Sequence, residues 1–401
     1  MKIIPRPFYI DKIENWFNRN TIIILTGQRR VGKSYLLRLV REKYIHNRGY
    51  NIIFIDKEKK EYDEIKKYED LNQYIDNKKV SGKRNIILID EIQDIEGFEK
   101  SLRSWYEEED VEIVVTGSNS KILSSELSTL IGGRYKEIYI QSLNYKEFLI
   151  FHNVEDSDES LKKFMRSGGL PGLMKIGLND NDVIEYQNDV LNTVLMKDVI
   201  LRNDIRNVAF LQNLINYLAD NTGKLISASN IAKYMKSNSN PVSVGVILNY
   251  LRYLSESFII RKVPRYDIHG KRLFENNEKY YFQDIGIRNT LIQNNRAFDI
   301  EKQIENIVYN ELVFQGYNIT VGQLSGKEVD FIAQKKGEEP HYIQVTYLLA
   351  SEETREREFG NLKLIHNNYP KYVISLDPYN DSSDYDGIKH LSLRHFLIHG
   401  L

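Results

Sequence analysis

The most constraining feature of the sequence is a glycine-rich loop that ends in a lysine and a serine. Residues 27–34 read GQRRVGKS and fit the pattern G-x-x-x-x-G-K-[S/T]. The loop follows an apolar run at residues 21–26 and precedes an amphipathic stretch at residues 34–46. A buried strand, a loop and a helix in this order form the context that the pattern requires, so the first part of the chain is predicted to be an α/β domain.

The residue types in this loop predict a nucleotide site. Gly27 and Gly32 allow backbone N–H groups to turn inward around phosphate oxygens. Lys33 is expected to reach the β- and γ-phosphates, and the Ser34 hydroxyl is expected to bind Mg²⁺. The positive end of the following helix points at the same anion. We therefore expect ATP and Mg²⁺ as cofactors. The predicted nucleotide contacts are Gly27, Gln28, Arg29, Arg30, Val31, Gly32, Lys33, Ser34 and Tyr35.

A second motif is a buried strand that ends in two acids, Asp90 and Glu91. Ligands of α/β sheets bind at the carboxyl ends of the strands, so both acids are expected at the nucleotide. Asp90 is predicted to hold Mg²⁺ through water, and Glu91 to orient and deprotonate the attacking water. The plain alternative is an acidic pair at a helix N-terminus. Two acids in this place favour hydrolysis over phosphoryl transfer to a small molecule.

Further candidate catalytic residues end or precede other strands. The run at residues 111–116 is followed by Gly117, Ser118 and Asn119, and either of the last two is a candidate contact of the γ-phosphate or the water. Their alternative role is a helix N-cap. Arg134 precedes the run at 136–140 and is a candidate for stabilising transition-state charge, with a surface ion pair as the alternative.

Five apolar runs, at residues 21–26, 51–56, 85–90, 111–116 and 136–140, alternate with helical stretches. This alternation is typical of a parallel sheet covered by helices, here a P-loop NTPase sheet. We expect this ATPase domain to occupy residues 1–155.

The rest of the chain is predicted to form three parts. Residues 156–205 read as a helical connector that is interrupted by a glycine-rich breaker at 168–172. Residues 206–292 show three helical stripes and then strand-like spacing, which is the order of a winged helix. Residues 293–401 mix strands and helices in an α/β pattern. The hairpin at 261–272 carries a local charge of +4, so it is a candidate DNA-binding wing.

Composition restricts the remaining possibilities. Lys and Arg number 55 against 56 Asp and Glu, so bulk charge gives no argument for a general coat on nucleic acid or on an anionic membrane. The sequence has no cysteine, which excludes disulfides, thiolate nucleophiles and cysteine-based zinc sites. Its eight histidines show no metal-ligand spacing. No apolar run is long enough to span a membrane, so we expect a soluble, cytoplasmic protein.

With these motifs identified, the chain resembles the AAA-type P-loop ATPases of bacteria and archaea that carry a C-terminal domain of unknown function. The resemblance rests on GQRRVGKS at 27–34, ILIDEIQ at 87–93, TGSNS at 116–120, GGRY at 132–135 and SGGLPG at 167–172. YYFQDIGIRN at 280–289 and EVDFIAQ at 328–334 add to it. It implies a sheet with one strand between the P-loop strand and the Asp90 strand. It also implies a winged helix followed by a restriction-endonuclease-like fold.

An active nuclease of that fold needs carboxylates on adjacent strands and a nearby lysine. Glu305 on the leading helix and Asp330 on a strand are in place, but the expected E-x-K is Gln344-Val345-Thr346. Gln is neutral and Thr carries no ammonium, which predicts a domain kept as an inactive scaffold. A lysine that has moved elsewhere is the alternative, with Lys327 or Lys335 as candidates.

The sequence therefore predicts a Mg²⁺-dependent ATPase that couples its nucleotide state to a winged-helix and a C-terminal domain. A nucleotide-gated switch with little turnover, acting on DNA or on a partner protein, is the alternative. An ATP-assisted nuclease comes third. Partners beyond ATP, the formation of oligomers, and action of Arg134 within or between subunits stay open.

Overall fold

A computed structural model of the 401-residue chain describes residues 4–117, 131–237, 241–274, 277–292, 299–349, 352–377 and 383–401. The chain divides into two compact units. The first comprises Met1–Gln141 with Glu256–Phe258, and the second comprises Ser142–Ser255 with Ile259–Leu401. The first unit holds the predicted ATPase sheet. The finer division of the second unit into three parts stays a prediction.

The first unit contains one five-stranded sheet in the order β2-β3-β4-β1-β5, and all its strand pairs are parallel. β4 therefore lies between β1 and β3, as the resemblance implied. The strands are β1 (Ile22–Thr26), β2 (Tyr50–Asp56), β3 (Arg84–Asp90), β4 (Val111–Thr116) and β5 (Tyr135–Tyr139). The helices are α1 (Pro7–Glu14), α2 (Lys33–Tyr44), α3 (Tyr68–Asp76) and α4 (Phe98–Trp105), with 3₁₀ turns at Lys60–Tyr62 and Ile92–Asp94.

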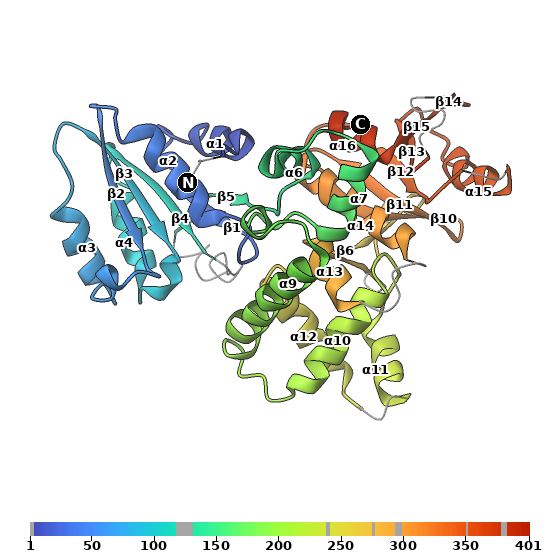
Figure 1. Cartoon of the computed structure of the whole chain (residues 1–401), viewed down its shortest axis with the longest axis horizontal. Coiled ribbons are helices and arrows are strands. Elements are labelled where there is room, and N and C mark those ends of the chain that lie inside the picture. Colours follow the sequence, from blue (N-terminus) through green and yellow to red (C-terminus); the bar gives the residue numbers. More distant parts are fainter. Residues whose placement is uncertain are drawn as a thin grey trace. The chain divides into compact units, whose positions relative to one another are not determined.

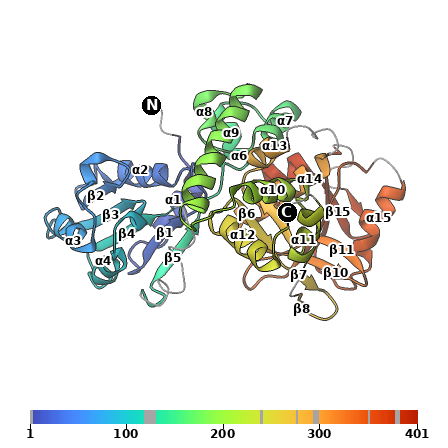
Figure 2. The same ribbon diagram turned by 90° about the horizontal axis from the view of Figure 1, so that it is seen from below.

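Helices cover this sheet on both faces, with α1 and α2 on one side and α3 and α4 on the other (Figures 1 and 2). The residues of β1 are all buried because both faces of the strand are covered, which explains its continuous apolar run. Ile22 and Ile24 pack in a core with α3 and α4, together with Trp105. Because helices cover both faces of the sheet, the loops lie at its two remaining edges, where the strands begin and end.

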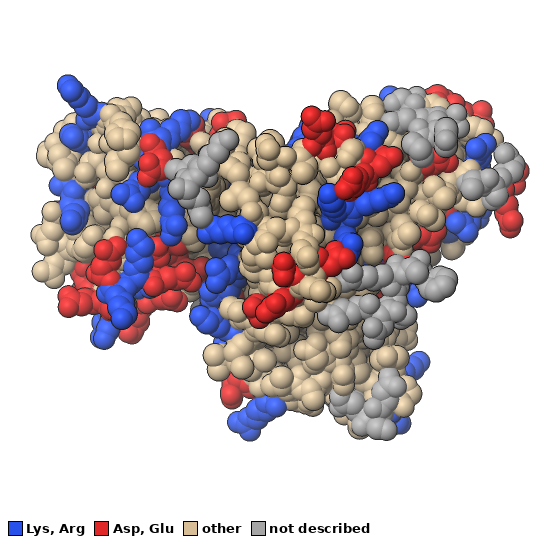
Figure 3. Space-filling view, in the orientation of Figure 1, with Lys and Arg blue, Asp and Glu red and all other residues tan. Residues whose placement is uncertain are grey.

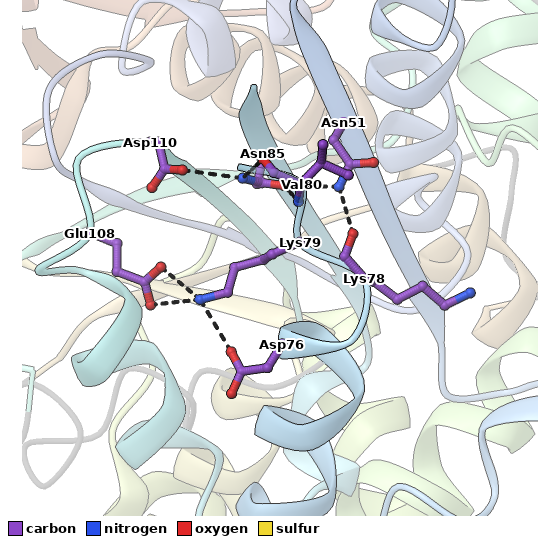
Figure 4. A network of polar contacts seen from close by, with 8 residues as sticks. All are labelled: Asn51, Asp76, Lys78, Lys79, Val80, Asn85, Glu108 and Asp110. Atoms are coloured by element: carbon purple, nitrogen blue, oxygen red, sulfur yellow. Dashed lines mark hydrogen bonds and ion pairs between the residues drawn. The ribbon is translucent and has the colours of Figure 1, made fainter. Parts of the chain in front are cut away.

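At the amino ends of the strands, the loops are tied together by a polar network (Figure 4). The buried Asn85 side chain accepts a hydrogen bond from Val80 N at 3.0 Å and from Asn51 Nδ2 at 2.9 Å. Lys79 Nζ donates to both carboxylate oxygens of Glu108, at 3.0 and 2.8 Å. These contacts give the buried Asn85 side chain its hydrogen-bond partners. The candidate site lies at the opposite edge of the sheet, where the strands have their carboxyl ends.

The second unit begins with helices. The first two, α6 and α7, pack in a core with the C-terminal strands, and the later ones pack in a separate apolar core with the strand pair β6–β9 and α13. The helices are α6 (Tyr145–His152), α7 (Asp158–Ser167), α8 (Leu173–Ile176), α9 (Asp180–Val194), a π-helical segment (Leu195–Ile200), α10 (Val208–Asp220), α11 (Ala228–Ser237) and α12 (Val244–Glu256). β6 (Ile260–Val263) and β9 (Lys279–Phe282) form an antiparallel pair, and α13 (Ile285–Leu291) follows. The order of three helices, α10 to α12, and a strand pair agrees with the predicted pattern.

The glycine-rich breaker and the QDIGIRN segment, which were predicted separately, pack against each other inside this unit. The buried Asp284 carboxylate accepts hydrogen bonds from Gly169 N at 2.9 Å, Gly286 N at 3.0 Å and Ile287 N at 3.2 Å. A Cβ on Gly286 would stand 2.3 Å from the Ser167 carbonyl oxygen, so only glycine allows this close approach. Both motifs therefore have a packing role that explains their residue types.

The C-terminal part is an eight-stranded mixed sheet in the order β14-β15-β13-β12-β11-β10-β7-β8. α14 and α16 pack on one face and α15 on the other. The strands are β7 (Arg265–Asp267), β8 (Arg272–Leu273), β10 (Asn318–Leu324), β11 (Lys327–Gln334), β12 (His341–Val345), β13 (Lys371–Ser375), β14 (Asp384–Tyr385) and β15 (Ile388–Ser392). The helices are α14 (Ile300–Phe314), α15 (Glu352–Lys363) and α16 (Leu393–His399).

The candidate basic wing at 261–272 is built into this sheet, because β7 pairs in parallel with β10. Several of its charges have partners within the unit: Lys262 contacts Glu278 at 3.0 Å, and Arg265 contacts Gln323. On the face drawn in Figure 3, much of the surface carries no charged side chain, and acidic and basic side chains adjoin one another in several places. At least two of the five basic residues of this hairpin therefore contact other residues of the protein.

Candidate functional site

The glycine-rich loop follows β1 and bends sharply before α2. Gly27 has φ +140°, and a Cβ there would stand 2.2 Å from the Ile140 carbonyl oxygen. Gly32 caps α2 with φ +100°. No other residue type fits this combination of positive φ and close backbone contact at Gly27. The loop therefore has the backbone that a phosphate cradle at a helix N-terminus requires.

Lys33 is the first residue of α2, and its side chain turns back into the loop. Only 4% of Lys33 is exposed, and its Nζ donates to the carbonyl oxygens of Gly27 at 2.8 Å and Gln28 at 3.0 Å. The side-chain amide of Gln28 is buried as well, and neither of its polar atoms has a partner among the described residues. Lys33 carries the only ammonium group of the loop. The loop's own carbonyl oxygens hold this group at the position where a phosphate is expected to bind.

Across the sheet edge, a chain of hydrogen bonds joins the two predicted metal ligands. Asp90 ends β3, and its Oδ1 accepts from the Thr116 hydroxyl at 2.5 Å. The Ser34 hydroxyl also hydrogen-bonds the Asp90 carboxyl. The structure therefore brings Ser34 and Asp90 together, although they lie far apart in the sequence. Oxygen ligands of this kind suit Mg²⁺, which is commonly held by one or two protein groups plus phosphates and water.

Burial raises the pKa of Asp90 to about 6, against the opposing effect of its hydrogen bonds from Thr116 and Ser34. The nearby carboxylates of Glu91 and Asp56 also raise this pKa by repulsion. Asp56 ends β2 directly beside Asp90 in the register. A bound dication would favour the ionised form of Asp90, so metal binding and proton loss at this group are coupled.

Glu91 lies just beyond β3 in a left-handed conformation with φ 52°. Its backbone N–H donates to the Thr116 hydroxyl at 2.9 Å, and its side chain accepts a hydrogen bond from the Gln93 amide. Thr116 therefore bridges both predicted acids. The sequence does not single out Thr116, because only the pairing of β3 with β4 brings its hydroxyl to Asp90. The signal in the sequence was a polar residue at the end of a buried strand.

The remaining loop residues differ in their surroundings. The Tyr35 hydroxyl accepts from Ile4 N at 2.6 Å and so ties the N-terminal segment to α2. Arg6, which is 1% exposed, donates to the Val31 carbonyl oxygen at 2.9 Å. Arg29 contacts Glu58 at 3.8 Å, and Arg30 is exposed. The N-terminal segment thus holds the loop and the start of α2 in place through hydrogen bonds from Arg6 and Ile4. No motif in the sequence indicates these contacts.

Of the other candidate catalytic residues, Arg134 is described, and it does not lie at this edge. Arg134 precedes β5, and its carbonyl oxygen accepts from Ile22 N at the start of β1. Four residues of β1, about 13 Å, separate this point from Thr26, where the loop begins. Arg134 instead lies over the Tyr106 ring at 4.7 Å and 3.9 Å from Glu107. Ser118 and Asn119 lie outside the described residues.

The second candidate site, in the C-terminal sheet, does bring Glu305 and Asp330 together. Neither predicted lysine joins them: Lys335 stacks on the Tyr317 ring at 4.5 Å, and Lys327 begins β11. The lysine at this cluster is Lys279, which lies 2.7 Å from Glu305 and 3.4 Å from Asp330. The sequence could not reveal it, because Lys279 belongs to the distant strand β9.

Comparisons with known proteins bear on the fold and the family of the chain. A family model described as an AAA domain matches residues 19–149, and one described as a domain of unknown function (DUF8612) matches residues 158–297. The parallel sheet, the P-loop and the AAA match together define an AAA-type P-loop protein, which is a nucleotide-binding class.

An uncharacterized protein of Haemophilus influenzae is 35% identical over 396 residues, which cover 96% of each chain. The chain belongs to the same family as that protein. An uncharacterized protein of Methanocaldococcus jannaschii, MJ1544, is 29% identical over 374 residues, covering 89% of this chain and 80% of that protein. The family is thus shown over nearly the whole length, while its members named here have no described activity.

Among solved structures, the Aeropyrum pernix ORC1 protein in complex with DNA matches with a TM-score of 0.32 and 11% identity, covering 75% of this chain and 95% of that one. A point variant of Thermotoga maritima RuvB matches with a TM-score of 0.35 and 16% identity, covering 65% of this chain and 90% of that one. Scores this low carry no further conclusion about this protein. Among the described residues, no helix is long and apolar enough to cross a membrane.

Proposed function

We propose that this protein binds ATP with Mg²⁺ and hydrolyses it at the site formed by the P-loop and the end of β3. The observation that carries the proposal is the hydrogen-bonded chain from Ser34 through Asp90 to Thr116 and Glu91. It joins the two proposed metal ligands, Ser34 and Asp90, to Glu91, and Ser34 directly follows Lys33 in the chain.

In this proposal the chain's own groups have distinct tasks. Bound Mg²⁺ would neutralise charge on the phosphates, and Ser34 and Asp90 would hold it. The loop N–H groups and Lys33 would bind the phosphates and Glu91 would orient the attacking water. Arg134 is not placed to act on the nucleotide of its own chain, so we assign it no step there. Ser118 and Asn119 stay candidates for the γ-phosphate.

Two substitutions test these tasks separately. Lys33→Ala is expected to abolish ATP binding, because it removes the only ammonium in the loop. Glu91→Gln is expected to keep ATP binding and to block turnover, because an amide cannot accept the water proton. Calorimetry with ATP and Mg²⁺, and phosphate release under single-turnover conditions, measure the two effects. Hydrolysis by Glu91→Gln at the wild-type rate would contradict the role of Glu91.

One observation favours the alternative of a nucleotide-gated switch with little turnover. The Gln93 amide holds the Glu91 carboxylate, and a carboxylate engaged in this way is less available to a water. We infer that Gln93 restrains hydrolysis until a partner changes this contact. Gln93→Ala is then expected to raise the basal rate, whereas Gln93→Glu would repel Glu91. An unchanged rate in Gln93→Ala would remove this argument.

For the second unit we propose a winged-helix-like element but no DNA-binding wing. We propose that α10 to α12 with β6 and β9 form a winged-helix-like element, as their order supports. We do not propose the hairpin at 261–272 as a DNA-binding wing, since Lys262 and Arg265 have partners within the fold. ATPase assays with and without double-stranded DNA across a salt series test DNA coupling, because phosphate contacts weaken with salt.

A further inference from the structure

A group of charged side chains lies where the C-terminal sheet meets β9. Lys279 and Asp330 are buried, whereas Glu305 and Glu328 are partly exposed. Lys279 of β9 is 1% exposed, and its ammonium contacts three carboxylates: Glu305 of α14 at 2.7 Å, Glu328 of β11 at 2.7 Å, and Asp330 of β11 at 3.4 Å. We call these four residues the Lys279 cluster. A buried lysine is rare unless it is paired, and here one ammonium meets three acids.

The place of this cluster in the fold is one where a divalent metal would be expected. α14 leads into the antiparallel strands β10, β11 and β12, and α15 then connects β12 to the parallel strand β13. The sequence resemblance implies a nuclease-like fold here, with Glu305 and Asp330 as metal ligands. Asp330 precedes Phe331, which pairs with Ile343, so Gln344 lies across from Asp330.

The residues present do not fit a divalent metal. The Lys279 ammonium stands within hydrogen-bonding reach of Glu305, Glu328 and Asp330, which is the point where a shared cation would bind. A dication placed there would meet a positive charge at contact distance. The neutral Gln344 also supplies one negative charge fewer than the acid usual at that position, which suits a monovalent cation better than a dication.

The acceptor oxygens of the two expected ligands are already used or covered. Glu305 Oε1 accepts from the Tyr281 hydroxyl at 2.6 Å in addition to Lys279. A Cβ on Gly223 would stand 2.4 Å from Glu305 Oε2, so the turn after α10 lies directly on that oxygen. Asp330 Oδ2 accepts from Val345 N at 2.8 Å. The cluster is therefore closed by protein groups on these sides.

The charge states agree with a fixed internal cation. Burial acts to lower the pKa of Lys279, but the attraction of Glu305, Asp330 and Glu328 outweighs it and keeps this pKa above its ordinary value. Burial raises the pKa of Asp330 to about 8, with the attraction of Lys279 working against the rise. The contacts with the three carboxylates thus favour the charged form of Lys279.

We propose that Lys279 is a built-in cation that replaces the divalent metal of this carboxylate cluster. The C-terminal sheet then uses the cluster to hold β9, and it has no metal-dependent nuclease activity. The cluster retains a latent cation site, which removal of the lysine side chain would open. This inference does not depend on the proposed ATPase activity.

The test compares wild type with variants of the Lys279 cluster for Mn²⁺ binding, using the full chain without nucleotide. Calorimetry and the Mn²⁺-dependent shift of the thermal midpoint measure the binding. Wild type and Asp330→Asn are expected to bind Mn²⁺ alike, because the cluster holds none. Lys279→Ala is expected to bind at least about tenfold more tightly than Lys279→Ala with Asp330→Asn, which lacks one ligand. Lys279→Arg is the matched control, since it keeps the internal charge.

Three outcomes would overturn the proposal. The first is Mn²⁺ binding by wild type that Asp330→Asn removes. The second is Mg²⁺- or Mn²⁺-dependent DNA cleavage by wild type that Asp330→Asn abolishes. The third is a folded Lys279→Ala variant, judged by far-ultraviolet circular dichroism, that binds Mn²⁺ no better than the double variant. Should Lys279→Ala not fold, the two wild-type comparisons decide the question without it.

Discussion

The Thr116 hydroxyl offers the sharpest test of how this site is built. It accepts a hydrogen bond from Glu91 N at 2.9 Å and donates one to Asp90 Oδ1 at 2.5 Å. Thr116→Val removes both bonds and keeps the shape of the side chain. Thr116→Ser is the matched control, because it keeps the hydroxyl and loses only a methyl group.

The expected magnitude follows from the two lost bonds. Leaving the buried Glu91 N–H without a partner costs about 1–3 kcal/mol, which corresponds to a factor of about 5 to 150 in rate. The left-handed conformation of Glu91 is itself unfavourable for a residue with a Cβ, so it is expected to relax once the bond is lost. We therefore expect Thr116→Val to lower turnover by about 5- to 150-fold with little change in ATP affinity.

The pH dependence gives a second readout of the same change. The pKa of Asp90 is about 6, so Mg²⁺ affinity is expected to fall as the pH drops through 6, because the protonated carboxyl binds metal poorly. The hydrogen bond from Thr116 lowers this pKa. Its loss in Thr116→Val moves the pKa up, so the decline is expected to begin at higher pH than in wild type.

The assay is steady-state ATP hydrolysis from pH 5 to pH 9 with a Mg²⁺ titration at each pH, and calorimetry with a non-hydrolysable ATP analogue reports binding. An unchanged rate and pH profile in Thr116→Val would refute the bridging role of the hydroxyl. A Thr116→Ser variant as impaired as Thr116→Val would assign the effect to packing of the methyl group instead.

Further predictions concern packing in the second unit and the place of Arg134. Asp284→Ala leaves three buried N–H groups unpaired and is expected to destabilise this unit by at least about 3 kcal/mol; Asp284→Asn keeps the Oδ1 acceptor and is expected to cost about 1–3 kcal/mol. Gly286→Ala places a Cβ against the Ser167 carbonyl and is expected to cost about 1–3 kcal/mol. Hydrogen exchange over 284–292 measures both effects, and unchanged fluorescence of the two tryptophans, which lie in the first unit, is the control. If Arg134 acts on a second copy, mixing Arg134→Ala with Lys33→Ala restores hydrolysis; inactivity of the mixture in an assembled oligomer would speak against it.

Much of the first unit could be predicted from the sequence, because its signals are local. Residues 21–34 combine an apolar run, two glycines and a lysine within one strand, loop and helix. Few folds other than that of a P-loop protein have these residue types at this spacing. The same holds for Asp90 and Glu91, since a buried strand that ends in acids presents them at the carboxyl edge of a parallel sheet.

Other features depended on pairings that no local pattern encodes. Thr116 became part of the site only through the register that sets β4 between β1 and β3. Arg134 was a candidate for the nucleotide until its position in parallel register beside the start of β1 put it at the other edge. The basic hairpin was a candidate wing until β7 joined the C-terminal sheet.

The sequence by itself determined that the chain has a P-loop, two acids opposite it and a C-terminal part that lacks the usual lysine after its strand acids. Only the tertiary structure decided that the lysine of that cluster is Lys279, from a strand 51 residues before Asp330. The physical reason is that strand and helix signals arise from neighbouring residues, whereas burial of one ammonium among three carboxylates depends on segments that meet only when the chain folds.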